Sequence, residues 1–404
     1  MEPVAQSCLI DVSRLIWRAW EGRFPTGIDR TCLAYVNHYG DAGRAVVQRG
    51  GRTWVLDRRT SQRLFGILKR QGTGVKQALL TLLPAAFASS IWPENLVGVP
   101  YLNVGHTGLD RLGHAAWIQK TGVLPIYFVH DLIPLTHPEY CRPGEAEKHL
   151  RRMTALLAHG AGVIGNSRQT LRELALFAES RLKLDLPPDV VAPLGVGKVA
   201  WELDRTSRLP TPVRPYFVIL GTIEGRKNHL LILNIWADLA RRLGPECPQL
   251  VIVGKRGWES EQAVDMLERC EAIRGHIIEA PRCEDARLAA YIAHARALLF
   301  PSFVEGYGLP LVEALSLGTP VIASDLTVFR ELAGEIPDYL SPLDGLGWTR
   351  LIEDYSNPES AARAAQLSRM EGWKTPRWRD HFARVDQWLA QFGVTSRQTQ
   401  MPNG

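Results

Sequence analysis

Short apolar runs rich in valine, isoleucine and leucine alternate along this chain with longer amphipathic stretches, and this alternation restricts the fold more than any other feature. Buried parallel strands are nearly continuous apolar runs, and each needs a crossover helix to bring the chain back to the same end of the sheet. The alternation is therefore typical of α/β domains in which helices cover both faces of a mostly parallel sheet.

The alternation is clearest in the second half of the chain. We expect strands over Tyr216–Leu220, Leu250–Gly254, His276–Ala280, Ala297–Pro301 and Pro320–Ser324. Helical patterns such as Asn228–Leu243 and Glu284–Ala295 lie between them. One doubly wound domain accounts for this order.

The first half has its own set of expected strands, at Cys8–Val12, Ala45–Gln48, Thr53–Leu56, Tyr101–Val104, Ile126–His130 and Gly162–Gly165. A proline-rich stretch with little apolar content, Arg205–Pro215, suits a linker between the halves. We therefore expect an α/β domain over residues 1–205 and a second over residues 206–370. A C-terminal helix at Trp378–Phe392 and a polar tail complete a third part, residues 371–404.

The composition is that of a globular protein without a nucleic-acid-binding surface. Hydrophobic residues make up 46% of the chain and charged residues 22%, so a large core can form. A net charge of +5 is far from the dense basic stripe that nucleic acids require. The six cysteines form no CxxC pair and no Asn-x-Ser/Thr acceptor occurs, so we expect reduced thiols and a cytoplasmic location.

Membrane insertion is not expected, but a contact with the membrane surface is open. Glu2, Asp11 and Arg14 interrupt the first 30 residues, so we expect no signal peptide there. The longest apolar stretch, Ala78–Ile91, is shorter than the roughly 20 residues that span a bilayer. The segment 64–87 mixes basic and large apolar side chains, which suits either a membrane interface beside anionic lipid or ordinary helices with solvated lysines.

The stretch Phe300–Ser324 has the pattern of an anion-binding site. An apolar strand ends at Pro301, a loop with Gly306 and Gly308 follows, and Pro310 falls where the first turn of a helix tolerates proline. Glycines let the backbone approach a ligand closely, and the first amides of a helix attract a phosphate. The main chain itself can therefore bind an anion here.

Two carboxylates in this stretch can face one ligand. Glu305 lies in the loop and Glu313, eight residues later, lies one turn inside the helix. A carboxylate accepts hydrogen bonds from paired sugar hydroxyls, so Glu305 can hold a hexose and Glu313 a ribose. The alternative for Glu313 is a solvated position on the helix surface.

A second polar cluster, Gly221–Asn228, follows an expected strand and opens a helix. Ligands of such sheets bind at the carboxyl ends of the strands. Arg226 supplies a planar fork and Lys227 a point charge, which complement a diphosphate that gains negative charge as its bond to a sugar breaks. The alternative is a surface Arg-Lys pair.

In the first domain, polar fragments follow three expected strands. His130 and Asp131 come directly after one strand, and the histidine is a neutral donor and acceptor near physiological pH. A structural histidine bonded to the backbone is the alternative. Gly27 opens a helix after the first strand, and Asn166 and Ser167 follow another, where they can contribute polar contacts.

Common motifs for other chemistry are missing. The sequence has no Walker A loop, no HExxH, no GxSxG, no GxGxxG after a strand and no Asp-x-Asp pair. We therefore expect no metal and no cofactor, and we expect protein cations and amides to stabilise the leaving group.

Together these segments resemble the retaining glycosyltransferases of family four, which have the GT-B fold. The stretch FVEGYGLPLVEA is close to the Glu-x7-Glu signature of that family. Five further segments stand in the family's order: FVHDLIPLTHP, VIGNSRQT, GTIEGRKNH, LVIVGKRGW and PVIASDLTVFRELAG. The match covers most of Cys8 to about Leu351, and six segments in order are far more specific than the spacing of two glutamates.

The resemblance implies a cleft between two Rossmann-like domains, with the nucleotide held mainly by the second and the acceptor mainly by the first. The residues that it places at the donor are Gly27, Gly221, Arg226, Lys227, Glu305, Gly306, Tyr307, Gly308, Leu309 and Glu313. It assigns catalytic roles to Glu305, Lys227, Arg226 and His130, and we place Asp131, Asn166 and Ser167 on the acceptor side. Relatives often carry glycine where this chain has Asp29.

The resemblance also implies a retaining, metal-independent hexosyl transfer. Relatives with a Val-His-Asp-Leu-Ile-Pro segment often use GDP-mannose, so we favour mannose as the transferred sugar. The expected acceptor is a growing lipid-linked glycan of an O-antigen, capsule or exopolysaccharide. Peripheral attachment to the cytoplasmic face of the membrane would bring the enzyme to such an acceptor.

Two other classes of protein remain open. A nucleotide-sugar epimerase or a glycan phosphorylase can share the architecture, although the phosphorylase needs a cofactor lysine. A non-catalytic sugar-binding or assembly protein is the other alternative, because a fold alone does not determine activity.

Overall fold

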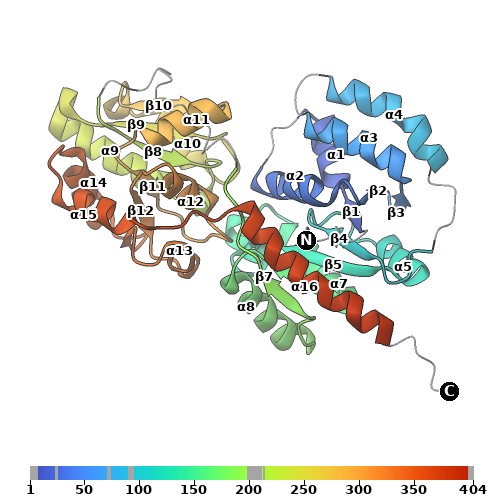
Figure 1. Cartoon of the computed structure of the whole chain (residues 1–404). Coiled ribbons are helices and arrows are strands. Elements are labelled where there is room, and N and C mark those ends of the chain that lie inside the picture. Colours follow the sequence, from blue (N-terminus) through green and yellow to red (C-terminus); the bar gives the residue numbers. More distant parts are fainter. Residues whose placement is uncertain are drawn as a thin grey trace. The chain divides into compact units, whose positions relative to one another are not determined.

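The computed structural model describes residues 8–22, 26–70, 74–89, 95–197, 212 and 214–398. The chain forms two α/β units (Figure 1). Unit 1 consists of residues 1–135, 144–194 and 378–404, and unit 2 of residues 136–143 and 195–377. Each unit has its own sheet and its own core, as the repeated strand–helix pattern predicts.

The sheet of unit 1 has seven strands in the order β3-β2-β1-β4-β5-β6-β7. They are Leu9–Asp11 (β1), Arg44–Arg49 (β2), Arg52–Val55 (β3), Pro100–Asn103 (β4), Leu124–Val129 (β5), Gly162–Gly165 (β6) and Asp189–Val191 (β7). Only the β2–β3 pair is antiparallel among these described strands. The parallel strands place all their carboxyl ends at one edge.

Helices cover both faces of this sheet. They are Ser13–Trp20 (α1), Gly27–Tyr39 (α2), Arg58–Lys69 (α3), Val75–Ser89 (α4), Leu112–Thr121 (α5), Ile133–Thr136 (α6), Glu145–His159 (α7), Arg168–Phe177 (α8) and Trp378–Gln398 (α16), with a π-helical turn at Ala178–Leu182. Met153 of α7 and Leu174 of α8 share a core with Tyr127 on one face of the sheet. On the other face Phe128 contacts the rings of Tyr35 in α2 and His381 in α16.

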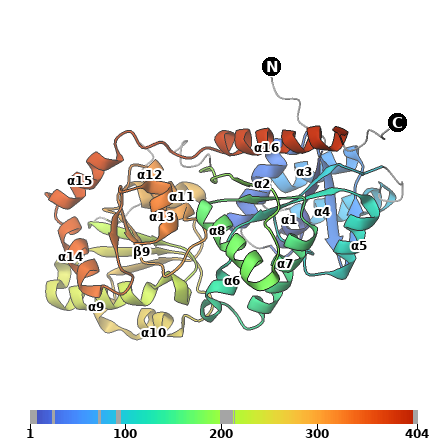
Figure 2. The same cartoon turned by 90° about the horizontal axis from the view of Figure 1, so that it is seen from below.

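The C-terminal helix α16 belongs to unit 1, whereas we expected residues 371–404 to stand apart (Figure 2). The Tyr35 hydroxyl donates to His381 Nε2 over 3.0 Å, and His381 Nδ1 donates to the carbonyl of Ala192 over 3.0 Å. The Tyr39 hydroxyl donates to Asp386 over 2.6 Å. The difference arises because the helix pattern shows an apolar face but not which sheet covers it.

The sheet of unit 2 has six parallel strands in the order β10-β9-β8-β11-β12-β13. They are Tyr216–Leu220 (β8), Gln249–Val253 (β9), Ile277–Ala280 (β10), Leu298–Phe300 (β11), Val321–Ser324 (β12) and Asp338–Leu340 (β13). The order reverses between β8 and β11, which is the switch point at which such sheets bind ligands.

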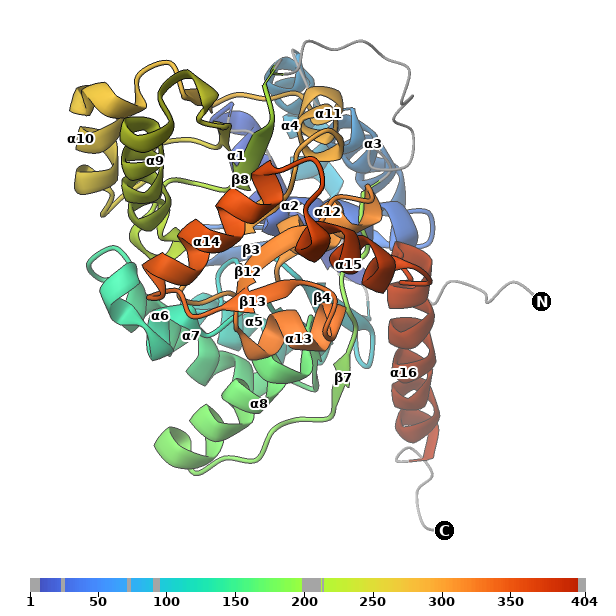
Figure 3. The ribbon, with the colours of Figure 1, turned by 90° about the vertical axis from the view of Figure 1, so that its left-hand side faces the viewer.

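The helices of unit 2 are His229–Leu243 (α9), Glu261–Arg269 (α10), Asp285–Ala293 (α11), Leu309–Ser316 (α12), Thr327–Ala333 (α13), Gly345–Ser356 (α14) and Ala361–Met370 (α15), with 3₁₀ turns at Gly225–Lys227 (η4), Gly244–Glu246 (η5) and Glu271–Ile273 (η6). Helix α9 packs beside α10 and α14 (Figure 3). Trp236 of α9 and Trp348 of α14 are fully buried in the same core as Phe217 and Ile252 of the sheet. On the opposite face, Phe300 stacks on Phe329 of α13.

Every strand that we expected is present with its ends shifted by at most two residues. The strands β7 and β13 were not predicted, because they lie at the edges of their sheets and their three residues are only partly buried, so they lack a long apolar run. The expected linker, Arg205–Pro215, lies mostly outside the described residues. None of the described helices combines the length and the apolar character of a membrane span.

We predict that His381→Ala destabilises unit 1. The substitution leaves the buried Tyr35 hydroxyl and the Ala192 carbonyl without their partner, at a cost of about 1–3 kcal/mol. Thermal unfolding measured by circular dichroism should show a lower Tm than for the wild type and for His294→Ala, a control at an exposed position of unit 2. An unchanged Tm for His381→Ala would show that α16 is not held by this bond.

Candidate functional site

The loops that follow β8 and β11 form the candidate site of unit 2. Strands β8 and β11 are parallel neighbours, so the loops that leave their carboxyl ends meet at one edge. The first loop, Gly221–Asn228, contains the 3₁₀ turn η4 and opens α9. The second, 301–308, opens α12.

Glycine is needed at one position in each loop. Gly221 has a φ of 131°, and a Cβ there would lie 3.1 Å from Lys227 Cε. Gly308 has a φ of 117° at the N-cap of α12, where a Cβ would lie 2.8 Å from the ring of Phe329. The loops therefore pack too closely, and in too unusual a conformation, for a side chain at either position.

Glu305 joins the two loops through ion pairs with both cations of the first loop. Lys227 Nζ lies 2.5 Å from Glu305 Oε1, and Arg226 Nη1 lies 2.9 Å from Glu305 Oε2. The Ser302 hydroxyl donates to Glu305 Oε1 over 2.8 Å. The second end of the Arg226 fork lies 2.7 Å from Glu224 Oε1. The structure thus brings Arg226, Lys227 and Glu305 together, as the motifs predict.

Backbone contacts support the same arrangement. The amide of Phe303 donates to the carbonyl of Arg226 over 2.8 Å, and Arg226 Nη1 donates to the carbonyl of Val304 over 3.2 Å. Lys227 Nζ lies 4.8 Å from the centroid of the Phe300 ring, a cation–π distance. We call the 3₁₀ turn Gly225–Lys227 the cationic turn. Strand β11 and the loop after it therefore hold this turn by backbone hydrogen bonds and a ring contact as well as by ion pairs.

The cluster keeps Glu305 ionised although the carboxylate is buried. Burial alone would raise the pKa of Glu305, but Arg226, Lys227 and the hydrogen bonds of the cluster outweigh it and hold the pKa at about 2. Burial acts in the opposite sense on Lys227, which is 7% exposed, and lowers its pKa. The side chain of Arg226 remains 22% exposed, so part of its positive charge faces solvent.

The other donor residues that we predicted lie in the same segment. Gly306, Leu309 and Glu313 are half-buried, and Tyr307 and Gly308 are buried. Glu313 is in the middle of α12, one turn beyond its start. Contacts of these residues with a donor remain predictions.

In unit 1, His130 lies at the carboxyl end of β5 and is 6% exposed. Its Nε2 donates to the carbonyl of Val104 over 2.8 Å, which leaves Nδ1 as an acceptor. Burial is the main influence on its pKa, which falls to about 4, so the ring is neutral at physiological pH. Asp131 accepts a hydrogen bond from the amide of Ile133 over 3.1 Å.

Asn166 and Ser167, which we predicted on the acceptor side, make hydrogen bonds within unit 1. Asn166 Nδ2 donates to the carbonyl of His130 over 2.8 Å and so supports the histidine. Ser167 is the N-cap of α8, where its hydroxyl accepts from the amide of Thr170 over 3.1 Å. Both side chains are buried, and their contact with an acceptor remains a prediction.

Gly27 is the first residue of α2, next to a capping box formed by Thr26 and Asp29. The buried Asp29 lies 2.7 Å from Arg14 Nε and 3.0 Å from Arg18 Nε. Burial would raise the pKa of Asp29, but Arg14 and the hydrogen bonds of Thr26 lower it instead. Asp29 thus fixes the start of this helix, a role that glycine cannot fill. Pro25, beside it, lies outside the described residues.

Sequence reasoning missed His106, which follows β4 in the same way as His130 follows β5. The two rings lie 5.4 Å apart between centroids, and His106 Nε2 lies 2.5 Å from the carbonyl of Phe128. The next residue is held as well, because the buried Gln48 Nε2 donates to the carbonyl of Thr107 over 2.9 Å. The signal was available, because Val-Gly-His ends an expected strand.

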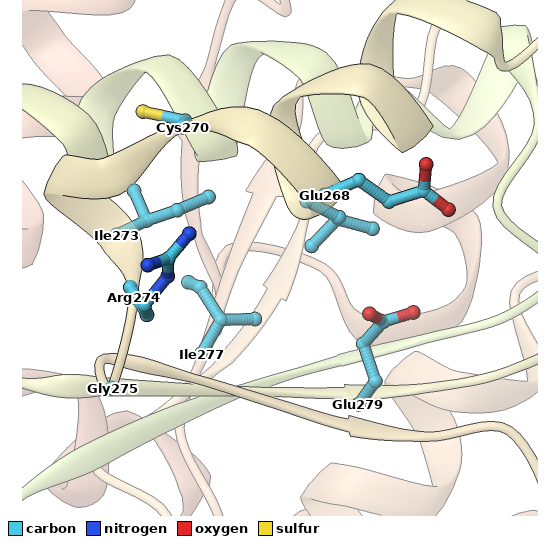
Figure 4. A pocket seen from close by; sticks show the side chains of 8 residues that line it. Glu268, Cys270, Ile273, Arg274, Gly275, Ile277 and Glu279 are labelled. Atoms are coloured by element: carbon cyan, nitrogen blue, oxygen red, sulfur yellow. The ribbon is translucent and has the colours of Figure 1, made fainter.

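A separate pocket of unit 2 lies between α10, η6 and β10 (Figure 4). Leu267, Glu268, Cys270, Ile273, Arg274, Gly275, Ile277 and Glu279 line it. Glu268 and Glu279 both pair with Arg256, and none of the predicted site residues takes part. Within the described ranges, no three histidine, cysteine, aspartate or glutamate side chains are grouped as a metal site requires.

Comparisons with known proteins show which sequences and folds this chain is similar to. Residues 202–364 match the family of glycosyl transferases group 1. The chain is 29% identical over 263 residues to the serotype-specific mannosyltransferase WbdA of Escherichia coli, an alignment that covers 60% of this chain and 32% of WbdA. It is 39% identical over 152 residues to the O-antigen chain mannosyltransferase RfbU of Salmonella typhimurium, covering 37% of this chain and 40% of RfbU.

The alignment with WbdA therefore spans about a third of that protein's length. Among solved structures, HepE of Anabaena in complex with UDP has a TM-score of 0.64 over 96% of this chain and 100% of that one. The identity is 13%, so this likeness shows the fold alone. The two Rossmann-like units are those of the GT-B fold.

We predict that Glu305 makes stability depend on pH. Its pKa is about 2 in the folded chain and near 4.5 without its partners, so its contribution is present above about pH 4.5 and is lost as the pH falls toward 2. The Tm of the wild type should exceed that of Glu305→Gln most at pH 7, and the gap should narrow on acidification. Glu359→Gln, at an exposed position, is the control. Parallel Tm curves for wild type and Glu305→Gln would contradict the ion-pair assignment.

Proposed function

Because this chain contains a glycosyl transferase group 1 domain in a GT-B fold, we propose that it transfers a hexose from a nucleotide diphosphate sugar to a glycan acceptor. The observation that carries the proposal is the cluster of Arg226, Lys227 and Glu305 at the switch point of the unit 2 sheet. Fixed cations complement a diphosphate, and a fixed carboxylate accepts hydrogen bonds from sugar hydroxyls. The cluster supplies both at one place.

The proposed reaction is a substitution at the anomeric carbon with retention of configuration. The bond from this carbon to the β-phosphate oxygen breaks, and a bond to the acceptor hydroxyl oxygen forms on the same face. The acceptor proton passes to an oxygen of the departing diphosphate. Arg226 and Lys227 stabilise the negative charge that develops there, and no metal ion is required for that task.

Glu305 has a free site for the sugar even in its ion-paired state. An ionised carboxylate has about four lone-pair sites. Lys227, Arg226 and Ser302 occupy three of them. We assign the fourth to a hydroxyl of the donor hexose. In unit 1, we assign to Nδ1 of neutral His130, whose Nε2 bonds to the Val104 carbonyl, the role of accepting a hydrogen bond from a substrate hydroxyl.

Mannose is the hexose that we propose, and a lipid-linked O-antigen type of glycan is the proposed acceptor. WbdA and RfbU are both described as mannosyltransferases, and RfbU as an O-antigen chain enzyme. The Val129–Pro134 segment, Val-His-Asp-Leu-Ile-Pro, favours the same donor class. GDP-mannose is the corresponding activated donor.

A basic and apolar surface on α3 and α4 fits an anionic membrane, where a lipid-linked acceptor would lie. Residues 58–89 contain six lysines and arginines and no acidic residue. Leu80 and Leu83 of α4 are 45% and 56% exposed. Lys76, Leu80 and Leu83 share one face of the helix, because they stand at positions i, i+4 and i+7. Basic charge next to exposed leucine is the pattern of an interfacial helix.

We predict that Lys227→Ala lowers the rate of transfer by about 100-fold or more, as loss of one donor to a developing oxyanion does. The assay follows GDP release from GDP-mannose in step with extension of a lipid-linked mannan acceptor. Lys374→Ala, at an exposed position of unit 2, is the control and should transfer at the wild-type rate. An epimerase would release no GDP. A Lys227→Ala rate equal to that of the wild type would argue against the proposed role, and loss of activity with EDTA would argue against metal independence.

We also predict that Leu80→Gln/Leu83→Gln weakens vesicle binding about tenfold, since two leucines no longer insert. The measurement is co-sedimentation with vesicles of phosphatidylethanolamine and phosphatidylglycerol at low salt. Leu176→Gln is the matched control, because Leu176 is a similarly exposed leucine on α8. Equal binding by the double variant and this control would remove α4 as the contact surface.

A further inference from the structure

A short segment from the first half of the sequence packs into unit 2. Residues 136–143 lie between β5 and α7 of unit 1 in the sequence, but they cluster with unit 2. Their centre is a 3₁₀ turn, Pro138–Tyr140 (η1). The chain thus crosses to unit 2 only a few residues after His130 and returns to unit 1 at Gly144.

Tyr140 in this segment contacts three loops at the carboxyl edge of the unit 2 sheet. Its ring stacks on Phe303 of the loop after β11, with centroids 5.6 Å apart and planes 8° apart. Its carbonyl accepts a hydrogen bond from Trp258 Nε1 of the loop after β9 over 3.3 Å. Its ring also faces Gly225 of the loop after β8, where an added Cβ would lie 3.6 Å from Tyr140 Cδ1.

Each of these loops is joined to the cationic turn, Gly225–Lys227, or to the residues just before it. Gly225 is covalently joined to Arg226, and the amide of Phe303 donates to the Arg226 carbonyl over 2.8 Å. On the third side, the amide of Gly257 donates to the carbonyl of Ile223 over 2.9 Å. Tyr140 therefore lies where all three loops meet. It contacts Gly225, the residue before Arg226, whose guanidinium we assign to the diphosphate.

A second aromatic contact holds the segment in place. The Arg142 guanidinium lies over the ring of Trp258, 4.6 Å from its centroid. Since Trp258 also bonds the Tyr140 carbonyl, residues 140 and 142 are both tied to the loop after β9. Two separate contacts therefore hold the segment against unit 2, as expected of a segment that stabilises the loops beside it.

We propose that Tyr140 is a positioning residue, whose ring braces the turn that carries Arg226 and Lys227. Its ring contacts Gly225 and Phe303, and it acts on the two cations through them. The inference deepens the proposed function and rests on it, because a braced turn matters to catalysis only if the turn binds the donor. Tyr140 contacts these loops through its ring and its carbonyl, so a phenylalanine should replace it and an alanine should not.

Hydrogen exchange followed by mass spectrometry tests the brace on the full chain without any substrate. In Tyr140→Ala we expect amides of residues 222–228 and 256–260 to exchange about tenfold faster, because a ring pair and a packing surface are lost. Tyr140→Phe should exchange like the wild type. Tyr339→Ala is the control, because it removes a half-exposed aromatic ring from another part of unit 2. It should leave the exchange rates of these two loops unchanged.

Steady-state kinetics then separates positioning from general damage. For Tyr140→Ala, kcat/KM for GDP-mannose should fall about tenfold while KM for the acceptor glycan stays at the wild-type value, and Tyr140→Phe should restore the rate. Unchanged exchange in Tyr140→Ala overturns the proposal, and so does a Tyr140→Phe variant as impaired as the alanine variant. If the wild type transfers no sugar, the proposed function fails, whereas the exchange result still decides the role of Tyr140.

Discussion

The double ion pair of Glu305 is the interaction on which the candidate site depends. A buried carboxylate is costly unless cations and hydrogen bonds compensate for it, and removing one partner of such a pair leaves an uncompensated charge. Lys227, Arg226 and Ser302 provide that compensation from two loops. These ion pairs therefore hold the two loops together, and under the proposed function a diphosphate would meet cations whose positions are already set.

The parallel sheet brings the partners of these ion pairs together. Neighbouring strands β8 and β11 end at one edge, so polar residues 78 positions apart in the sequence come into contact. The same rule operates in unit 1, where His106 and His130 follow the neighbouring strands β4 and β5 and their rings come together. In this architecture, polar side chains meet because they follow neighbouring strands of the sheet, and not because they are close in the sequence.

The sequence was sufficient for the strands, for the α/β class and for the meeting of Arg226 and Lys227 with Glu305, because each depends on local pattern plus the edge rule. The sequence did not predict which segments far apart in the chain pack against each other. The docking of α16 on unit 1 and the contact of Tyr140 with Phe303 depend on surface shape, which periodicity does not encode. Ser167 caps α8, which a serine before a helix is expected to do, and its contact with an acceptor stays a prediction.

The most direct test of the account is a calorimetric titration of GDP-mannose into the wild type and into Arg226→Gln. In the proposed function the partly exposed Arg226 binds the diphosphate. A charge-assisted hydrogen bond is worth about 1.5–3 kcal/mol, so Kd should rise at least about tenfold in the variant. Equal affinities, with both proteins folded, would contradict the claim that this cationic turn binds the donor.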